Sequence, residues 1–161
     1  MKEHIISLLR YNDTANHTLL HTILQLPHRD EALRLFSHLI SAQDKWMNRI
    51  TNAAPDSQYQ WYGPVYDADR IGGEWERSIN AWKELISDTG ETDLRQYIYF
   101  HRPADGRKMM LPLADLFLQI NYHSMHHRAQ INKLISAQGL PLPATDFIFT
   151  VLREAPAPDS V

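Results

Sequence analysis

The sequence predicts an all-α protein built as a four-helix bundle, and two patterns lead to this prediction. Apolar residues recur at three- and four-residue spacing in four separate stretches, which is the pattern of a helix with one buried face. Residues that break helices separate these stretches, and the chain contains neither an internal repeat nor a low-complexity tract.

The first two expected helices are separated by a short break. The buried face of the first consists of Ile5, Leu8, Leu9, Asn12, Ala15, Asn16, Leu19, Ile23 and Leu26, and Pro27 ends the run. Asp30 suits the N-cap of the second helix, whose apolar stripe consists of Leu35, His38, Leu39, Ala42, Trp46 and Ile50. A histidine therefore lies on the apolar face of the second helix.

A long connection is expected between the second and third helices, because prolines and glycines interrupt the segment from Thr51 to Gly73. The third helix then places Trp75, Ile79, Trp82 and Ile86 on one face and ends near Gly90. After it, Tyr97 to Phe100 and Lys108 to Leu111 predict a β-hairpin or an extended crossing loop, with a turn at Asp105-Gly106.

The fourth helix is predicted to begin at Pro112, which suits a first turn, and to end at Gly139 and Pro141. Its single face consists of Leu116, Ile120, His123, His127, Ile131 and Leu134. The tail at residues 155–161 is expected to be loose.

Length and composition fit one globular domain, which we expect to span residues 1–161. The chain is 43% hydrophobic and 22% charged, and no apolar run approaches the roughly 20 residues that a membrane-spanning helix needs. The start of the chain, MKEHIISLLRYND, has no sustained apolar region of the signal-peptide kind. We therefore expect a cytoplasmic protein without a membrane partner.

Cysteine usage and charge exclude several classes of function. The absence of cysteine excludes disulfides, thiolate ligands and cysteine nucleophiles, so a metal ion must be held by histidine or oxygen. The net charge of -3, without a run of Lys and Arg, argues against a nucleic-acid partner, which would need a basic face.

The fourth helix carries a histidine pair of the kind that binds metals. His123 and His127 are four residues apart, so both project from the apolar face with their Cβ atoms roughly 6 Å apart. Two unpaired imidazoles among apolar side chains are costly unless something binds them, and a divalent ion does this well. Metal sites in bundles use inward side chains of facing helices, so His38 is the third candidate ligand. Three histidines would leave coordination positions open, as in catalytic sites.

The other polar candidates have simpler explanations. His126 lies about 100° around the helix from His127 and is expected at the surface. The same holds for the remaining histidines, His4, His17, His21, His28 and His101. Asn12 and Asn16 could line a pocket or could instead form hydrogen bonds within the bundle. The absence of glutamate between His123 and His127 removes the metalloprotease motif H-E-x-x-H.

The motifs together resemble the DinB-like family of four-helix bundle proteins, over essentially the whole chain. The family pattern consists of an early Y-N-x-x-x-N, a histidine followed eight residues later by tryptophan, and a late H-x-x-x-H-R-G-Q-I. It appears here as Tyr11, Asn12 and Asn16, then His38 and Trp46, then His123, His127, Arg128, Ala129, Gln130 and Ile131. The chain departs from the pattern in two places, because Ala129 replaces the usual glycine and Gln119 stands where many relatives carry another histidine.

The resemblance implies an up-down-down-up bundle, one divalent metal ion on three histidines, and a homodimer. We expect zinc as the ion, with nickel as the alternative. Characterised relatives include transferases that attach low-molecular-weight thiols to electrophiles and a thiol-dependent isomerase, so a thiol and an electrophilic small molecule are the expected partners. Asn12, Asn16 and Gln119 are candidate residues of the substrate pocket.

The leading functional hypothesis is therefore a metal-dependent thiol S-transferase. A metal-dependent hydrolase is the first alternative, and it would need a general base near the open position of the ion. A non-catalytic, stress-related bundle with a structural ion or none is the second.

Overall fold

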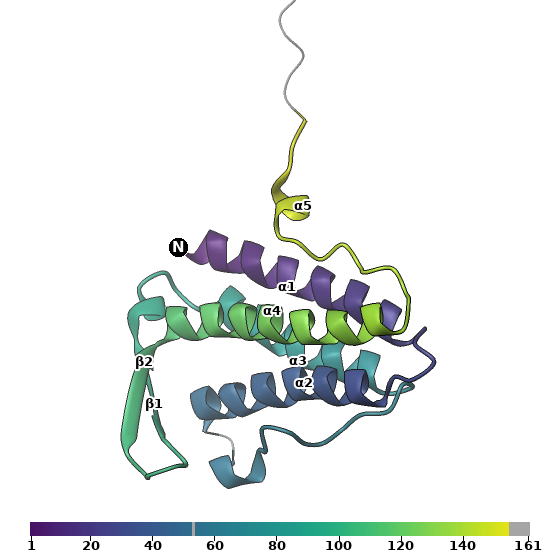
Figure 1. Ribbon diagram of the computed structural model, residues 1–161. Helices are drawn as coiled ribbons and strands as arrows, with labels where there is room; N and C mark the ends of the chain where they lie inside the picture. Colours follow the sequence, from purple (N-terminus) through teal and green to yellow (C-terminus); the bar gives the residue numbers. More distant parts are fainter. Residues whose placement is uncertain (53, 155–161) are drawn as a thin grey trace, which may run out of the picture.

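The computed structural model describes residues 1–52 and 54–154, in which four long helices form a bundle (Figure 1). They are α1 (Lys2–Ile23), α2 (Asp30–Thr51), α3 (Ile71–Asp88) and α4 (Leu113–Ala137). α1 and α4 run in one direction and α2 and α3 in the other, so the up-down-down-up prediction is confirmed. The predicted loose tail, residues 155–161, lies outside the described residues.

The smaller elements connect these helices. The connection between α2 and α3 contains the short 3-10 helix η1 (Asp56–Gln58), and a second one, η2 (Asp93–Arg95), follows α3. An antiparallel hairpin of β1 (Tyr97–His101) and β2 (Lys108–Pro112) precedes α4, as predicted, and a one-turn helix α5 (Ile148–Val151) follows it. Gly106 has a φ of +68°, which explains why the hairpin turn carries glycine there.

α4 lies beside both α1 and α2, and α3 lies beside both on the opposite side of the bundle. The core between them contains the largest fully buried side chains, Trp75, Trp82, Phe36 and Phe117. Phe36 meets Trp75 edge-on with their ring centres 5.4 Å apart, and Trp82 meets Phe117 in the same way at 5.5 Å. Each such side chain stabilises the fold by about 1.5–3 kcal/mol through burial alone.

Three predicted helix starts were wrong by a few residues. Asp30 is the first residue of α2 and Arg29 its N-cap, although an acidic residue still interacts favourably with the helix dipole there. α3 begins at Ile71 and includes the two glycines that were assigned to the connection. Ile71 is fully buried, and this burial offsets the roughly 1 kcal/mol that a glycine costs in a helix. Pro112 is the last residue of β2 and the N-cap of α4, so it precedes the first helical turn in which it was predicted.

Two buried cations hold the connection between α2 and α3 against the bundle. Arg49 donates from Nε to Oδ1 of Asp56 at 2.8 Å, and Lys45 lies 2.9 Å from the other carboxylate oxygen. The Arg49 guanidinium also lies over the rings of Trp46 and Trp61, 4.6 and 5.2 Å from their centres. These contacts fix the chain that leads to Trp61 next to the histidines.

The two buried indoles lead to a prediction, because only one of them uses its N–H group. Trp75 donates to Asp13 at 2.9 Å, whereas Nε1 of Trp82 is buried without a hydrogen-bond partner among the described residues. Replacing either by phenylalanine loses similar packing, but Trp75→Phe also loses a hydrogen bond worth about 1 kcal/mol. Urea unfolding should therefore show Trp75→Phe to be the less stable variant by about 1 kcal/mol. Equal stability of the two variants would contradict the assigned bond.

Within the described part of the chain, no helix combines the length and the apolar character needed to cross a membrane.

Candidate metal centre

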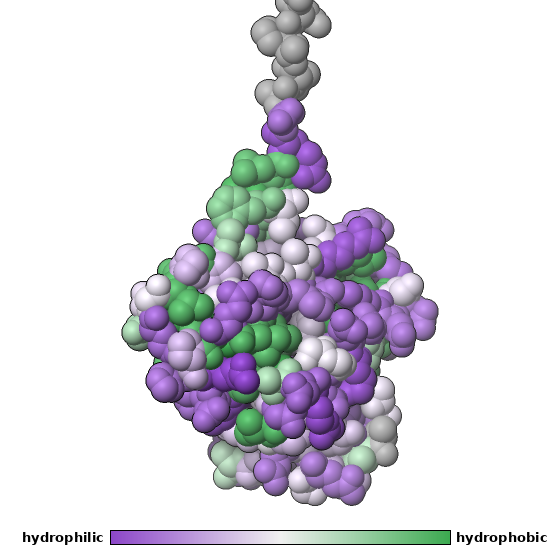
Figure 2. All heavy atoms as spheres, turned by 90° about the vertical axis from the view of Figure 1, so that its right-hand side faces the viewer, coloured by the Kyte–Doolittle hydropathy of each residue, from purple (hydrophilic) through white to green (hydrophobic). Residues whose placement is uncertain are grey.

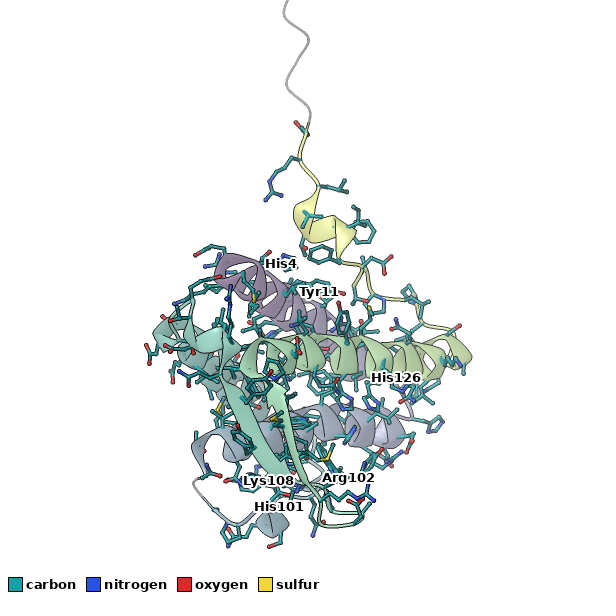
Figure 3. All side chains as sticks on the ribbon, turned by 90° about the vertical axis from the view of Figure 1, so that its left-hand side faces the viewer. His4, Tyr11, His101, Arg102, Lys108 and His126 are labelled. Atoms are coloured by element: carbon teal, nitrogen blue, oxygen red, sulfur yellow. The ribbon has the colours of Figure 1, made fainter. Side chains whose placement is uncertain are left out.

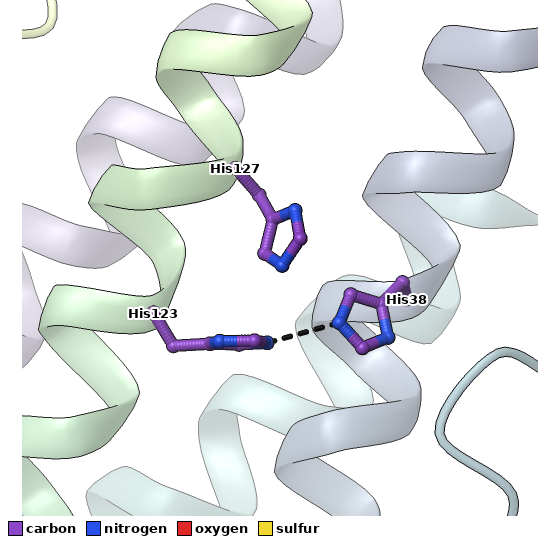
Figure 4. A group of neighbouring side chains, drawn as sticks. All are labelled: His38, His123 and His127. Atoms are coloured by element: carbon purple, nitrogen blue, oxygen red, sulfur yellow. Dashed lines mark hydrogen bonds between the residues drawn. The ribbon is translucent and has the colours of Figure 1, made fainter.

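Three histidines from two helices converge between α2 and α4 (Figure 4). His38 comes from α2, and His123 and His127 come from successive turns of α4. One ring nitrogen of each lies within 4.8 Å of the others. His38 and His127 are buried and His123 is half-buried, so all three side chains are held by their surroundings.

Helix periodicity explains this convergence. His123 and His127 share a face of α4 with Ile120 and Ile131, which are both buried in the core. On α2, His38 lies beside Leu39 on the face turned toward α4. The apolar neighbours therefore determine where the three imidazoles point.

Hydrogen bonds orient two of the rings so that Nε2 is free to bind an ion. Nδ1 of His38 donates to the backbone oxygen of Trp61, and Nδ1 of His127 donates to Oε1 of Gln130 at 2.7 Å. A metal-binding histidine usually donates its other ring N–H in this way, which fixes the tautomer and the ring orientation. The acceptor for His38 comes from the long connection, and the acceptor for His127 comes from α4 itself.

The spacing of the nitrogens fits a single ion. Nε2 of His123 lies 3.1 Å from Nε2 of His38. Two nitrogen ligands of a tetrahedral zinc ion, each 2.0–2.1 Å from the metal, are roughly 3.3 Å apart. The set therefore needs only small adjustments to hold one divalent ion.

Burial keeps the three imidazoles neutral. It lowers the pKa of His123 to about 4, and repulsion from His127 and His38 adds to the effect. Burial also lowers the pKa of His38 and of His127 below the ordinary value for histidine. A protonated imidazole cannot bind a metal ion, so these shifts leave the lone pairs available at neutral pH.

The histidines lie in a hollow of about 670 Å³ that opens to solvent. Its other lining residues are Glu31, Arg34, Leu35, Tyr62, His126, Gln130, Lys133 and Leu134. Tyr62 stacks on His38 with their ring centres 4.1 Å apart and the planes at 10°. A small molecule can therefore reach the side of the histidine cluster that the protein does not cover.

The remaining predicted site residues lie elsewhere. Asn12 and Asn16 are fully buried, and Oδ1 of Asn12 accepts from the Arg128 guanidinium at 2.9 Å. Neither asparagine lines the hollow. Of the two roles that the sequence suggested, pocket lining or hydrogen bonding within the bundle, the structure shows the hydrogen bonds. Gln119 is exposed and also lies outside the lining.

The structure agrees with the surface assignment of the other histidines. His126 is exposed at the mouth of the hollow, where its Nε2 accepts from Gln130 at 3.1 Å. The five remaining histidines, His4, His17, His21, His28 and His101, are exposed as well.

Sequence reasoning missed several residues of the hollow. Arg34 and Glu31 precede His38 by four and seven residues, so helical spacing could have placed them on its face. Gln130 follows His127 by three residues and could have been found in the same way. Tyr62 reaches the site from the long connection, and no sequence pattern indicates its position.

Comparison with known proteins adds one finding. A sequence model described as the DinB superfamily matches residues 32–131, which is more than half of the chain and includes all three histidines. No curated protein and no solved structure matches the chain significantly.

Proposed function

Because the chain belongs to the DinB superfamily, we propose that it is a metal-dependent transferase that attaches a low-molecular-weight thiol to an electrophilic small molecule. The observation that supports this proposal is the group of three neutral imidazoles at one side of an open hollow. The chain has no cysteine, so the thiol is a second substrate.

A divalent ion on the three histidines would lower the pKa of a thiol that reaches it, so that the thiolate forms near neutral pH. The reaction joins sulfur to carbon of the electrophile, whose leaving group departs, and the thiol proton passes to solvent. We propose zinc as the ion, because imidazole ligands in tetrahedral spacing suit it, with nickel as the alternative.

The protein residues of the hollow have separate roles in this proposal. Trp61 and Gln130 hold His38 and His127 in place through the hydrogen bonds described above. Glu31 pairs with Arg34, so the positive charge of Lys133 remains in the lining, and it favours thiols that carry a carboxylate. Tyr62 covers one face of His38 and keeps water from that side.

A hydrolase remains the second candidate because one carboxylate, Glu31, lines the hollow. A hydrolase would use it as the general base for a water molecule. Glu31 instead accepts two hydrogen bonds from Arg34, at 2.7 and 2.6 Å, and this partner lowers the pKa of its carboxyl group. A carboxylate with a lowered pKa is a weak base, which favours the transferase.

The transferase proposal predicts catalysed consumption of thiol. Zinc-loaded protein is incubated with glutathione, bacillithiol, mycothiol or coenzyme A and the electrophile monochlorobimane, and conjugate fluorescence is followed. A free thiol with a pKa near 8.5 is only about 3% ionised at pH 7, so full ionisation raises the rate by up to about 30-fold, less the nucleophilicity that a thiolate of lower pKa loses. His123→Ala should lose this gain, about tenfold, for the preferred thiol.

The control variant Glu31→Gln separates the candidates. It should keep thiol transfer, whereas a hydrolase would lose activity with it. If no thiol reacts faster with the wild type than with His123→Ala, the transferase proposal fails. Bound metal without any turnover would support the non-catalytic alternative.

We also propose that the protein forms a homodimer, as the family resemblance implies. Apolar side chains of α5 and its flanks are exposed, among them Ile148, Phe149 and Leu152. This segment projects above the bundle in Figure 1, and Figure 2 shows a green surface at the same height. A second copy would cover such side chains. Light scattering should give twice the mass of one chain at micromolar concentration, and a single-chain mass would refute the dimer.

A further inference from the structure

A second hollow, of about 530 Å³, lies between the C-terminal part of α2, η1 and the hairpin. It shares no lining residue with the histidine hollow. Its volume is within the range of roughly 300–1,000 Å³ that is usual for small-molecule sites.

The lining of this hollow is strongly basic. It contains the cations Lys45, Arg49, Arg102 and Lys108 and a single carboxylate, Asp56. Even when Asp105, which pairs with Arg102, is included, positive charges outnumber negative ones by two. The whole chain carries a net charge of -3, so this positive charge is concentrated locally against the overall balance.

The two inner cations are buried and share one counter-ion. Lys45 and Arg49 are only 4% and 5% exposed, and both pair with Asp56, at 2.9 and 2.8 Å. Arg49 uses Nε and Nη2 for this carboxylate, while its Nη1 has no acceptor among the described residues. Nη1 is not among the side-chain nitrogens that are buried without a partner, so it can donate to an anion that enters the hollow.

The outer cations extend from the hairpin. His101 and Lys108 are partners in the β1–β2 register, and Figure 3 shows both close to Arg102 at the turn end of the hairpin. Lys108 lies over the ring of Tyr99 on the outer face of the hairpin, 4.9 Å from the ring centre, whereas the next residue, Phe100, faces the bundle and contacts Arg49. The hollow thus has cations at its rim and one aromatic ring, Phe100, on its inner side.

We propose that this hollow binds the phosphate or carboxylate group of a small organic molecule whose apolar part lies against Phe100. Arginine matches such oxyanions with parallel N–H donors, and lysine adds a point charge. The buried Arg49 receives the oxyanion at the inner end, and Arg102 and Lys108 close over it. The site is independent of the metal centre and of the reaction proposed there.

Nuclear magnetic resonance titration of the zinc-loaded chain tests the proposal. The probes are inorganic phosphate, phenyl phosphate and benzoate, which distinguish phosphate from carboxylate and measure what the ring adds. Saturable shifts are expected in the backbone amides of Asp56–Gln58, of Arg102 and of Ala104–Lys108. Phenyl phosphate or benzoate should bind about tenfold more tightly than inorganic phosphate, because the ring of Phe100 lines the site.

Two variants on the exposed hairpin test the charges without disturbing the core. Arg102→Gln and Lys108→Gln should each weaken the binding of phenyl phosphate or benzoate about tenfold, since each removes a charge-assisted contact. Arg70→Gln is the matched control, because Arg70 is also an exposed arginine in an ion pair and lies outside both linings. It should bind like the wild type.

The proposal is overturned if no probe saturates below about 10 mM, a limit that corresponds to roughly 2.7 kcal/mol of binding free energy. It is also overturned if both hairpin variants bind like the wild type. Shifts confined to His123 and His127 would place the anion on the metal instead. None of these results affects the thiol assay, so the anion site and the thiol transferase are tested independently of each other.

Discussion

Replacing His38, His123 or His127 by alanine should reduce bound metal from about one ion per chain to almost none. Each substitution removes one of three nitrogens that lie within 4.8 Å of one another, and among the described residues no fourth histidine or carboxylate belongs to this group. Losing an outer-shell partner already costs roughly 10–100-fold in metal affinity, and losing a ligand costs more. Elemental analysis after dialysis against a weak chelator measures the effect.

His126→Ala is the matched control for this experiment. His126 is adjacent to a candidate ligand and lies at the same hollow, but it is exposed and bonded to Gln130. The variant should keep a full complement of metal. Equal loss from all four variants would contradict the assignment of the three ligands. Gln130→Ala should give an intermediate result, with full loading at high metal concentration and roughly 10–100-fold weaker affinity.

Removing the metal should lower the stability of the fold by several kcal/mol. An ion that binds only the folded chain stabilises it by about 4 kcal/mol when its free concentration is 1,000 times the dissociation constant. For a chain of this size that corresponds to a fall in Tm of roughly 8–16 °C after chelation. Thermal unfolding followed by circular dichroism, with and without chelator, measures the difference. In His123→Ala the chelator should have no effect, and an equal shift there would rule out stabilisation through this site.

The same measurement has an expected pH dependence. Burial lowers the pKa of His123 to about 4 in the folded chain, whereas its pKa in the unfolded chain is near 6.5. The contribution of His123 to the free energy of unfolding is therefore complete above pH 6.5. That contribution is lost as the pH falls from 6.5 toward 4, because the unfolded chain then binds the additional proton. Protons compete with the metal for the folded histidines, whose pKa values burial lowers, to about 4 for His123. The difference in stability between loaded and chelated protein should therefore be constant near neutral pH and shrink as the pH falls toward 4, and a difference that stays constant below pH 4 would argue against histidine ligands.

The sequence predicts the bundle well because its signals are local. The spacing of Trp75, Ile79 and Trp82 requires a helix whatever surrounds it, and Asp105-Gly106 requires a turn. The exact start of α3 depends on tertiary burial of Ile71, which no local pattern records. Helical spacing also places His123 beside His127, and the apolar stripes bring His38 to them, although their role as ligands stays a prediction.

Other parts of the site depend on distant contacts and could not be predicted. Asn12 and Asn16 lie on the inner face of their helix, as expected, and the Arg128 guanidinium from α4 donates to the side-chain oxygens of both. Tyr62 lies on His38 because the connection is held against the end of α2 by Arg49 and Asp56. The sequence shows that such a connection exists but not its path.

The histidines that converge between α2 and α4 are far apart in sequence, since His38 and His123 are 85 residues from each other. An ion bound to both would therefore act as a reversible cross-link that closes about half of the 161-residue chain into a loop. α2 cannot separate from α4 while the link is intact, so it would oppose global unfolding more than fraying of the chain ends. If the link forms after the folding transition state, its free energy appears almost entirely as slower unfolding. The rate of ion release would then determine how long the metal-loaded protein survives heat or proteolysis.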